Sequence, residues 1–142
     1  MPKQSAAAIC YRSAAGAVEV LLVRTSSGAR RIFPKGNVER GETTAAAAAR
    51  EAAEEAGVAG HVAPEPFATF PWTRHGEPVA VVAHLLEVTD DDAFTPEPGR
   101  DPQWFSLAAA REELALNRTP QEAAALHDVL SKAFDDHDRD RR

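Results

Sequence analysis

The most informative segment of the sequence is Gly36-Asn37-Val38-Glu39-Arg40-Gly41-Glu42-Thr43, followed by the alanine-rich run 44–49 and by Arg50-Glu51-Ala52-Ala53-Glu54-Glu55-Ala56-Gly57-Val58. It predicts a glycine-containing loop that leads into a helix, because almost every residue from Thr43 to Ala56 is a strong helix former. Thr43 is a suitable N-cap for that helix, and Gly57 is a suitable residue to end it.

Three carboxylates lie on one side of this predicted helix. Glu51 is separated from Glu54 and Glu55 by three and four residues, so the three side chains are neighbours on the helix surface. Like charges at this spacing oppose helix formation, and Arg50, four residues before Glu54, offsets part of the repulsion. Convergent carboxylate oxygens are the ligands that Mg²⁺ or Mn²⁺ prefers, especially when phosphate oxygens complete the coordination shell. With Lys35 placed beside a phosphate, the layout suits a metal-bound di- or polyphosphate.

Each of these features is ordinary when taken alone. A helix rich in Ala, Glu and Arg is usually a solvated surface helix, and Gly36 and Gly41 alone would mark turns. The joint spacing is what favours a functional site, with the two glycines allowing the backbone to approach a ligand closely. A helix that is merely an acidic partner-binding surface would bind no divalent metal.

Segment 36–58 resembles the Nudix box, in which a glycine is followed by five residues, a glutamate, seven residues and then Arg-Glu-apolar-any-Glu-Glu-any-Gly-apolar. The residues at its fixed positions are Gly36, Glu42, Arg50, Glu51, Glu54, Glu55, Gly57 and Val58. Ala52 stands where a larger apolar residue is more usual, a departure that affects packing and not ligation. The resemblance implies an α/β protein of the Nudix type: an α/β/α sandwich with a mixed sheet, a catalytic loop and helix after the early strands, and a C-terminal helix.

The resemblance also implies a hydrolase acting on a nucleoside diphosphate linked to another moiety, with Mg²⁺ as cofactor and Mn²⁺ as a substitute. By position, the metal ligands would be Glu51, Glu54, Glu55 and the backbone carbonyl of Lys35. Glu51, or a metal-bound hydroxide, would assist removal of a proton from the attacking water. Arg50 would orient the carboxylates as part of the catalytic set, and Glu42 would be a further ligand or a structural brace. Family members often recruit another carboxylate from outside the box, and the candidates are Glu77, Glu87 and Glu97.

Residues before the box bear on the substrate. Arg31-Ile32-Phe33-Pro34-Lys35-Gly36 looks like the subgroup that acts on diadenosine polyphosphates and diphosphoinositol polyphosphates, although Arg31 stands where that subgroup often has an aromatic residue. The expected substrate-binding residues are Lys35, Gly36, Arg31, Arg40 and Trp72, of which Trp72 is equally well explained as a core residue. One alternative is a nucleoside triphosphate pyrophosphohydrolase that sanitises oxidised nucleotides. Another is a non-catalytic Nudix-fold module that senses a nucleotide, and the retention of every box glutamate favours the enzyme.

Length, composition and charge restrict the class of protein and its partners. The chain has 142 residues with 16 Lys and Arg against 22 Asp and Glu, a net charge of −6, which argues against a nucleic-acid polymer as partner. We expect one domain over 1–142, with a core at about 5–134 and a charged, frayed tail at 135–142. No apolar run approaches the ~18 residues that span a membrane, and no secretory signal is evident. The expectation is a cytoplasmic protein, a monomer or homodimer, acting on a small-molecule polyphosphate.

Apolar patterning and turn residues predict the remaining elements. A hairpin is expected from strands 6–11 and 17–24, joined by a turn at 13–16. Further strands are expected at 61–72, interrupted by prolines, at 79–88 and at 103–105, with a loop at 73–76. Helices are expected at 107–115, capped by Ser106, and from Pro120 onward, where Thr119 and Glu122 form a capping box. The single cysteine, Cys10, is expected to be a buried thiol.

Overall fold

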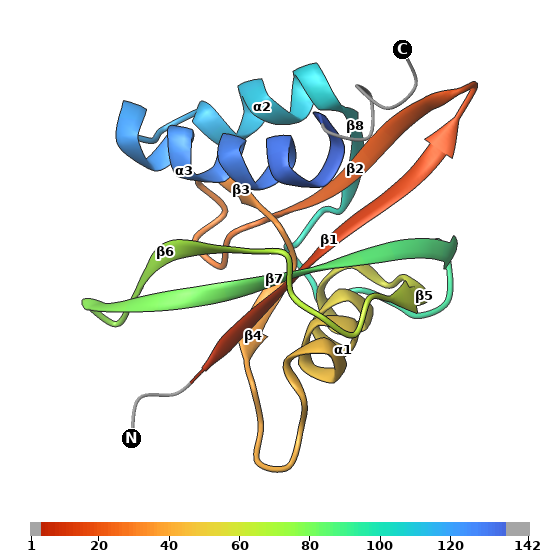
Figure 1. Ribbon diagram of the computed structural model, residues 1–142, viewed down its shortest axis with the longest axis horizontal. Coiled ribbons are helices and arrows are strands. Elements are labelled where there is room, and N and C mark those ends of the chain that lie inside the picture. The colour runs from red at the N-terminus through yellow and green to blue at the C-terminus, as the bar shows by residue number, and fades with distance from the viewer. Residues whose placement is uncertain (1–3, 136–142) are drawn as a thin grey trace.

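The computed structural model describes residues 4–135, and these residues build a mixed sheet with helices on both faces (Figure 1). The strands are β1 (Ser5–Ala14), β2 (Ala17–Arg24), β3 (Arg31–Ile32), β4 (Lys35–Asn37), β5 (Ala59–Val62), β6 (Ala68–Arg74), β7 (Glu77–Asp90) and β8 (Gln103–Ser106). The helices are α1 (Thr44–Ala56), α2 (Leu107–Ala115) and α3 (Pro120–Leu130), and α3 continues into a π-helical turn, η1 (Ser131–Asp135). None of the helices within the described part is long and apolar enough to cross a bilayer.

The long strand β7 organises the sheet. It pairs in parallel with β1 along one edge, and along its other edge it pairs in antiparallel fashion first with β6 and then with β5. The strand predicted over 61–72 with proline breaks is two strands, because Pro64 and Pro66, which cannot donate to a ladder, lie in the connection between them. Pro71 lies inside β6, and a proline is tolerated there because β7 is the one described strand that β6 pairs with. The predicted loop 73–76 shortens to a turn, since β6 runs to Arg74 and β7 begins at Glu77.

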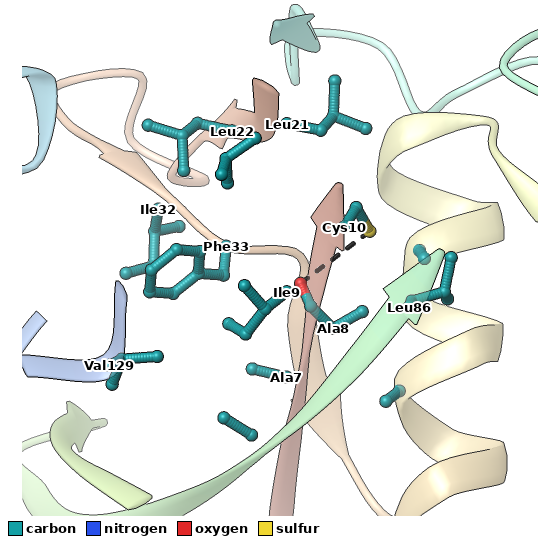
Figure 2. Packing of buried hydrophobic residues seen from close by; sticks show 14 of the residues in the cluster. Ala7, Ala8, Ile9, Cys10, Leu21, Leu22, Ile32, Phe33, Leu86 and Val129 are labelled. Carbon is teal, nitrogen blue, oxygen red and sulfur yellow. Dashed lines mark hydrogen bonds between the residues drawn. The ribbon is translucent and has the colours of Figure 1, made fainter. Parts of the chain in front are cut away.

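The two faces of the sheet receive different helices. Figure 1 shows α2 and α3 together on one side and α1 on the other, where α1 contacts β1, β4, β5 and β7. In β1 the side chains alternate: Ala8 and Cys10 point toward α1, whereas Ile9 points toward Phe33 and Val129 (Figure 2). The Cys10 thiol is fully buried, as predicted, and burial raises its pKa, which makes it a poor nucleophile.

Small side chains bring α1 close to the sheet. Both surfaces of this contact are rich in alanine, all of it buried: Ala6 and Ala8 in β1, and Ala45, Ala47, Ala48, Ala52 and Ala56 in α1. The helix begins as predicted, with the Thr43 hydroxyl accepting a hydrogen bond from the Ala46 amide at 3.0 Å. It ends at Gly57 with φ 74°, where a β-carbon would lie 2.5 Å from the Phe94 carbonyl oxygen. The position of α1 is therefore fixed by its alanine contacts along the helix and by the residues that cap its two ends.

The C-terminal half follows the predicted caps. Ser106 caps α2, and Thr119 and Glu122 form the capping box of α3. The last helix buries Ala123, Leu126, Leu130 and Phe134, with Phe134 in the π-helical turn. Apart from Asp135, the charged tail predicted to fray lies outside the described residues.

Candidate active site

Gly36 is the point at which β4 and α1 come into contact. A β-carbon at this position would lie 2.2 Å from Glu51 Oε2 and 2.8 Å from Glu51 Oε1, distances that no side chain permits. Glycine therefore lets the Glu51 carboxylate lie directly against the backbone of β4. Glu51 is 8% exposed, so this contact is made in a largely dry environment. Gly36 was predicted to bind substrate, and in the structure its observed contact is with Glu51.

Arg50 joins the carboxylates of the loop and the helix. Its guanidinium forms a two-pronged pair with Glu42, with contacts of 2.8 and 3.0 Å, and its Nη1 lies 2.9 Å from Glu51 Oε2 and 3.4 Å from Glu54 Oε2. Its Nη2 also donates to the Asn37 carbonyl at 2.9 Å. The hydrogen bond from Arg50 lowers the pKa of Glu42 to about 2. These are the contacts expected of Glu42 as a structural brace.

Glu55 faces cations from two other elements. Its Oε1 accepts a hydrogen bond from the Lys35 amide at 3.2 Å, and its Oε2 lies 3.4 Å from Arg100 Nη2. Burial nevertheless raises the pKa of Glu55 to about 7, and the nearby Glu51 carboxylate adds to the shift. Burial also raises the pKa of Glu51, against the effect of Arg50. The positive charge around the two buried carboxylates is therefore too small to stabilise both of them in the ionised form.

The strand edge beside these carboxylates offers backbone oxygen. The Lys35 amide donates to Glu55 and the Asn37 carbonyl accepts from Arg50, so both residues direct their peptide groups toward α1. In an extended strand the N–H and C=O of one residue point to the same side, which places the Lys35 carbonyl on this edge as well. The oxygens of Glu51, Glu54, Glu55 and Lys35 thus make a donor set that suits a hard divalent cation.

In the structure these carboxylate oxygens contact donors of the protein. Arg50 holds Glu51 and Glu54, whereas Lys35 and Arg100 hold Glu55. Within the described residues, no three His, Cys, Asp or Glu side chains converge in a geometry that would hold a metal ion. The residues fit Mg²⁺ by chemistry and by burial, and binding it would require Glu51 and Glu54 to exchange their contacts with Arg50 for the metal.

A polar cleft of about 510 Å³ opens beside Glu55. Its lining includes three cationic side chains, Lys35, Arg74 and Arg100, together with the ring of Trp72. Lys35 Nζ lies 3.9 Å from the centre of the Trp72 ring, and burial lowers the pKa of Lys35 to about 8. The Arg74 guanidinium donates to the Asn37 side chain. The cleft therefore concentrates positive charge next to the buried carboxylates, in a chain whose net charge is −6.

The residues predicted to bind substrate separate into two groups. Lys35 and Trp72 line the cleft. Arg31 is 4% exposed, and its guanidinium pairs with Asp101 at 2.8 Å beneath the loop before β8, so the structure does not bring it to the cleft. Arg40 is exposed on the loop between β4 and α1 and is likewise absent from the cleft lining. Arg74, which the sequence placed in a loop without a role, takes a place in the lining, as does Arg100.

The structure distinguishes the three carboxylates proposed outside the box. The Glu97 amide donates to the Glu54 carbonyl at 2.9 Å, and Glu97 Oε1 lies 3.0 Å from Arg100, the arginine that also contacts Glu55. Glu77 lies opposite Arg74 at the β6–β7 turn, and Glu87 lies opposite His61 within the sheet. Glu97 is thus the one of the three that shares an arginine with a box glutamate.

Comparison with known proteins identifies the family. Residues 1–129 match the family model for the NUDIX domain. The chain belongs to the Nudix family. It is 31% identical over 124 residues to Nudix hydrolase 13, mitochondrial, from Arabidopsis thaliana, an alignment that covers 80% of this chain and 60% of that protein. It is 56% identical over 43 residues to Nudix hydrolase 16, mitochondrial, from the same plant, which covers 30% of this chain and 24% of that protein. The chain therefore spans less than two thirds of either relative.

Solved structures of Nudix proteins confirm the predicted fold. The Ap4A hydrolase of C. elegans superposes with a TM-score of 0.71 at 24% identity, covering 94% of this chain and 96% of that one. A NUDIX hydrolase from Nitrosomonas europaea gives 0.71 at 23% identity, covering 96% and 90%. The NUDIX domain of Shewanella oneidensis NrtR, complexed with ADP ribose, gives 0.65 at 14% identity, covering 92% and 86%. At these identities the likeness establishes the Nudix α/β/α architecture.

Proposed function

We propose that this Nudix protein is a metal-dependent hydrolase of a pyrophosphate bond in a nucleoside diphosphate linked to another moiety, with a diadenosine polyphosphate or a diphosphoinositol polyphosphate as substrate. The observation that carries the proposal is that the buried Glu55, a neighbour of the buried Glu51 on α1, lines a cleft together with Lys35, Arg74 and Arg100. A cation bound by the box oxygens would neutralise phosphate charge and lower the pKa of water for attack on phosphorus.

The chain's own residues would bind and orient the phosphates. Lys35, Arg74 and Arg100 offer charge-assisted hydrogen bonds along the cleft, which suits a chain of several phosphates. Arg50 orients the box carboxylates through its contacts with Glu42, Glu51 and Glu54. Such positioning and electrostatic stabilisation supply most of the catalysis in phosphoryl transfer.

Two glutamates are candidates to accept the proton of the attacking water. Glu51, the residue that the family resemblance suggests, has Oε2 engaged by Arg50 and is largely buried. Glu97 has a side chain that is 44% exposed and is linked to Glu55 through Arg100. We place the proton on Glu97, because an exposed carboxylate next to the cleft can reach water without leaving a buried contact.

The Ap4A hydrolase among the structural neighbours is in keeping with a dinucleoside polyphosphate substrate. Two alternatives are hydrolysis of an oxidised nucleoside triphosphate and nucleotide sensing without cleavage. The substrate panel below distinguishes both of them from the proposed activity. A cytoplasmic location and a monomeric or homodimeric state stay predictions.

A substrate panel tests the proposal. Purified protein is incubated with diadenosine tetraphosphate, a diphosphoinositol polyphosphate, ATP and an oxidised deoxyguanosine triphosphate, each with Mg²⁺ and with EDTA, and products are separated by chromatography. We expect hydrolysis of one of the first two substrates in preference to the triphosphates, and its loss in EDTA. Turnover of the triphosphates alone would support the sanitising enzyme. Thermal stabilisation by nucleotide without turnover would support the sensing module.

A further inference from the structure

A second pocket adjoins the polar cleft at Trp72. It has a volume of about 240 Å³ and is bounded by β6, by the loop before β3 and by the start of α3. Its lining residues are Arg30, Pro71, Trp72, Thr73, Pro78, Arg118, Glu122 and Leu126. Because Trp72 and Thr73 also line the polar cleft, the two spaces meet at this part of β6.

The Trp72 ring is the junction between them. Lys35 approaches it from the cleft, with Nζ 3.9 Å from the ring centre. Two residues of the second pocket also approach it: the guanidinium carbons of Arg30 and Arg118 lie 5.6 and 5.7 Å from the ring centre. All three cations are within the range in which an aromatic ring attracts positive charge. Positive charge is thus continuous from the cleft to the second pocket.

One nitrogen of the Arg118 guanidinium donates no hydrogen bond to the described residues. Its Nη1 donates to the carbonyls of Leu114 and Arg31, both at 2.8 Å, which fixes the guanidinium. Its Nη2 is buried and has no hydrogen-bond partner among the described residues. A buried donor without a partner is costly, so an acceptor from a ligand would be favourable here.

The charges of this pocket do not balance. Arg30 and Arg118 are both cationic, and the Arg30 charge adds to the effect of burial in lowering the pKa of Arg118 to about 10. Glu122 is the one carboxylate in the lining, and its Oε1 already accepts the Thr119 amide at 2.8 Å in the capping box. The pocket therefore carries an excess of positive charge that an anion would offset.

The rest of the lining is apolar. Pro71, Pro78 and Leu126 supply a wall that a phosphate alone would not use, whereas a planar nucleobase can pack against it. We propose that this pocket binds the second nucleotide end of a dinucleoside polyphosphate, with its base against the apolar wall and its phosphate toward Arg30 and Arg118. The polyphosphate chain would then pass Trp72 to reach the cleft. This inference rests on the proposed function and narrows its substrate class, because a phosphorylated inositol ring has no base for the apolar wall.

Binding measurements separate this pocket from the cleft. Calorimetry in Mg²⁺ at fixed salt compares a methylene-bridged, non-hydrolysable analogue of diadenosine tetraphosphate with the corresponding analogue of ATP. Arg30→Ala is the main variant, because within residues 4–135 the Arg30 side chain contacts the Trp72 ring but forms no ion pair or hydrogen bond that the substitution would break. Arg118→Lys is the second, since it keeps the charge and removes the guanidinium fork. Lys132→Ala, which removes an exposed cation near the end of α3, is the control.

The expected result is a loss of affinity for the dinucleotide analogue of about tenfold in each pocket variant, the loss of one charge-assisted contact. The ATP analogue should bind all proteins within about twofold, because it fills the cleft alone. Equal losses for both analogues, or no loss for either, would overturn the second site even if the protein hydrolyses dinucleoside polyphosphates. A wild-type protein that binds and cleaves no dinucleotide at all would instead count against the proposed substrate.

Discussion

The acidic face of α1 and the cationic residues around Trp72 differ in the partners that their charged groups contact. On α1, Arg50 contacts Glu42, Glu51 and Glu54, so the carboxylates meet a guanidinium. Around Trp72, the cations meet an aromatic ring and backbone carbonyls: Lys35 lies on the ring, and Arg118 donates to two carbonyl oxygens. On α1 one guanidinium contacts three carboxylates, so negative charge is in excess, whereas the pocket beside Trp72 has two arginines and one glutamate, so positive charge is in excess.

This difference shows how an acidic protein can receive an anionic substrate. Burial is the main reason that the pKa of Lys35 is lowered to about 8 and that of Arg118 to about 10, so both cations would gain from a further anion nearby. The carboxylates of α1, by contrast, are held by Arg50 before anything binds, and a metal would replace Arg50 as the partner of Glu51 and Glu54. We expect substitutions on α1 to change turnover and substitutions around Trp72 to change affinity.

Glu54→Gln gives the largest effect expected from this contrast. Its side chain is 47% exposed, so the substitution should leave stability within about 0.5 kcal/mol. Removing one carboxylate ligand should lower kcat by roughly 100-fold or more, because metal charge stabilises the transition state by several kcal/mol. Steady-state kinetics at saturating Mg²⁺ measures this. Glu112→Gln, a similar change at an exposed position of α2, is the matched control, and near-normal turnover in Glu54→Gln would show that Glu54 is not a ligand.

Lys35→Met tests the cationic side of the comparison. A methionine retains contact with the Trp72 ring but loses the charge, so KM should rise by about tenfold while kcat changes less. The pH profile sharpens the test, since kcat/KM reports the free enzyme. With a pKa of about 8, wild-type Lys35 loses its proton as the pH rises through 8, and kcat/KM should fall there. The variant should lack this step, and parallel profiles in the two proteins would contradict a role for the Lys35 charge.

Local sequence signals predicted α1 well. Its residue spacing alone placed Glu51, Glu54 and Glu55 on one face, and Thr43 and Gly57 end the helix as expected. The strand predicted over 61–72 is interrupted at Pro64 and Pro66 as expected but not at Pro71, and its two parts pair with different parts of β7, a partner beyond any local pattern. Pro71 within β6 is compatible with the sheet for the same reason: whether a strand lies at an edge depends on the topology.

The cationic residues were harder to predict because their partners are distant in sequence. Arg31 was expected at the cleft but is buried against Asp101, 70 residues away. Arg118 reaches the Arg31 carbonyl across 87 residues, and its position after α2 gave no local signal of a place in a pocket. Gly36 was predicted by its motif position, but its close approach to Glu51 could be seen only once β4 and α1 were packed together.

Glu42→Gln is expected to give the smallest effect. It tests the ion pair of Glu42 with Arg50 through the pH dependence of stability. Arg50 lowers the pKa of Glu42 from 4.5 to about 2, so the ionised carboxylate stabilises the fold above pH 4.5 and this contribution is lost as the pH falls toward 2. The free energy of unfolding of the wild type should therefore exceed that of Glu42→Gln at pH 7, and the gap should narrow as the pH falls from about 5 to 3. Urea unfolding in EDTA measures this without any contribution from bound metal. A gap that stays constant over this range would mean that the pair of Glu42 with Arg50 adds no stability, and that α1 is held in place by its alanine contacts with the sheet alone.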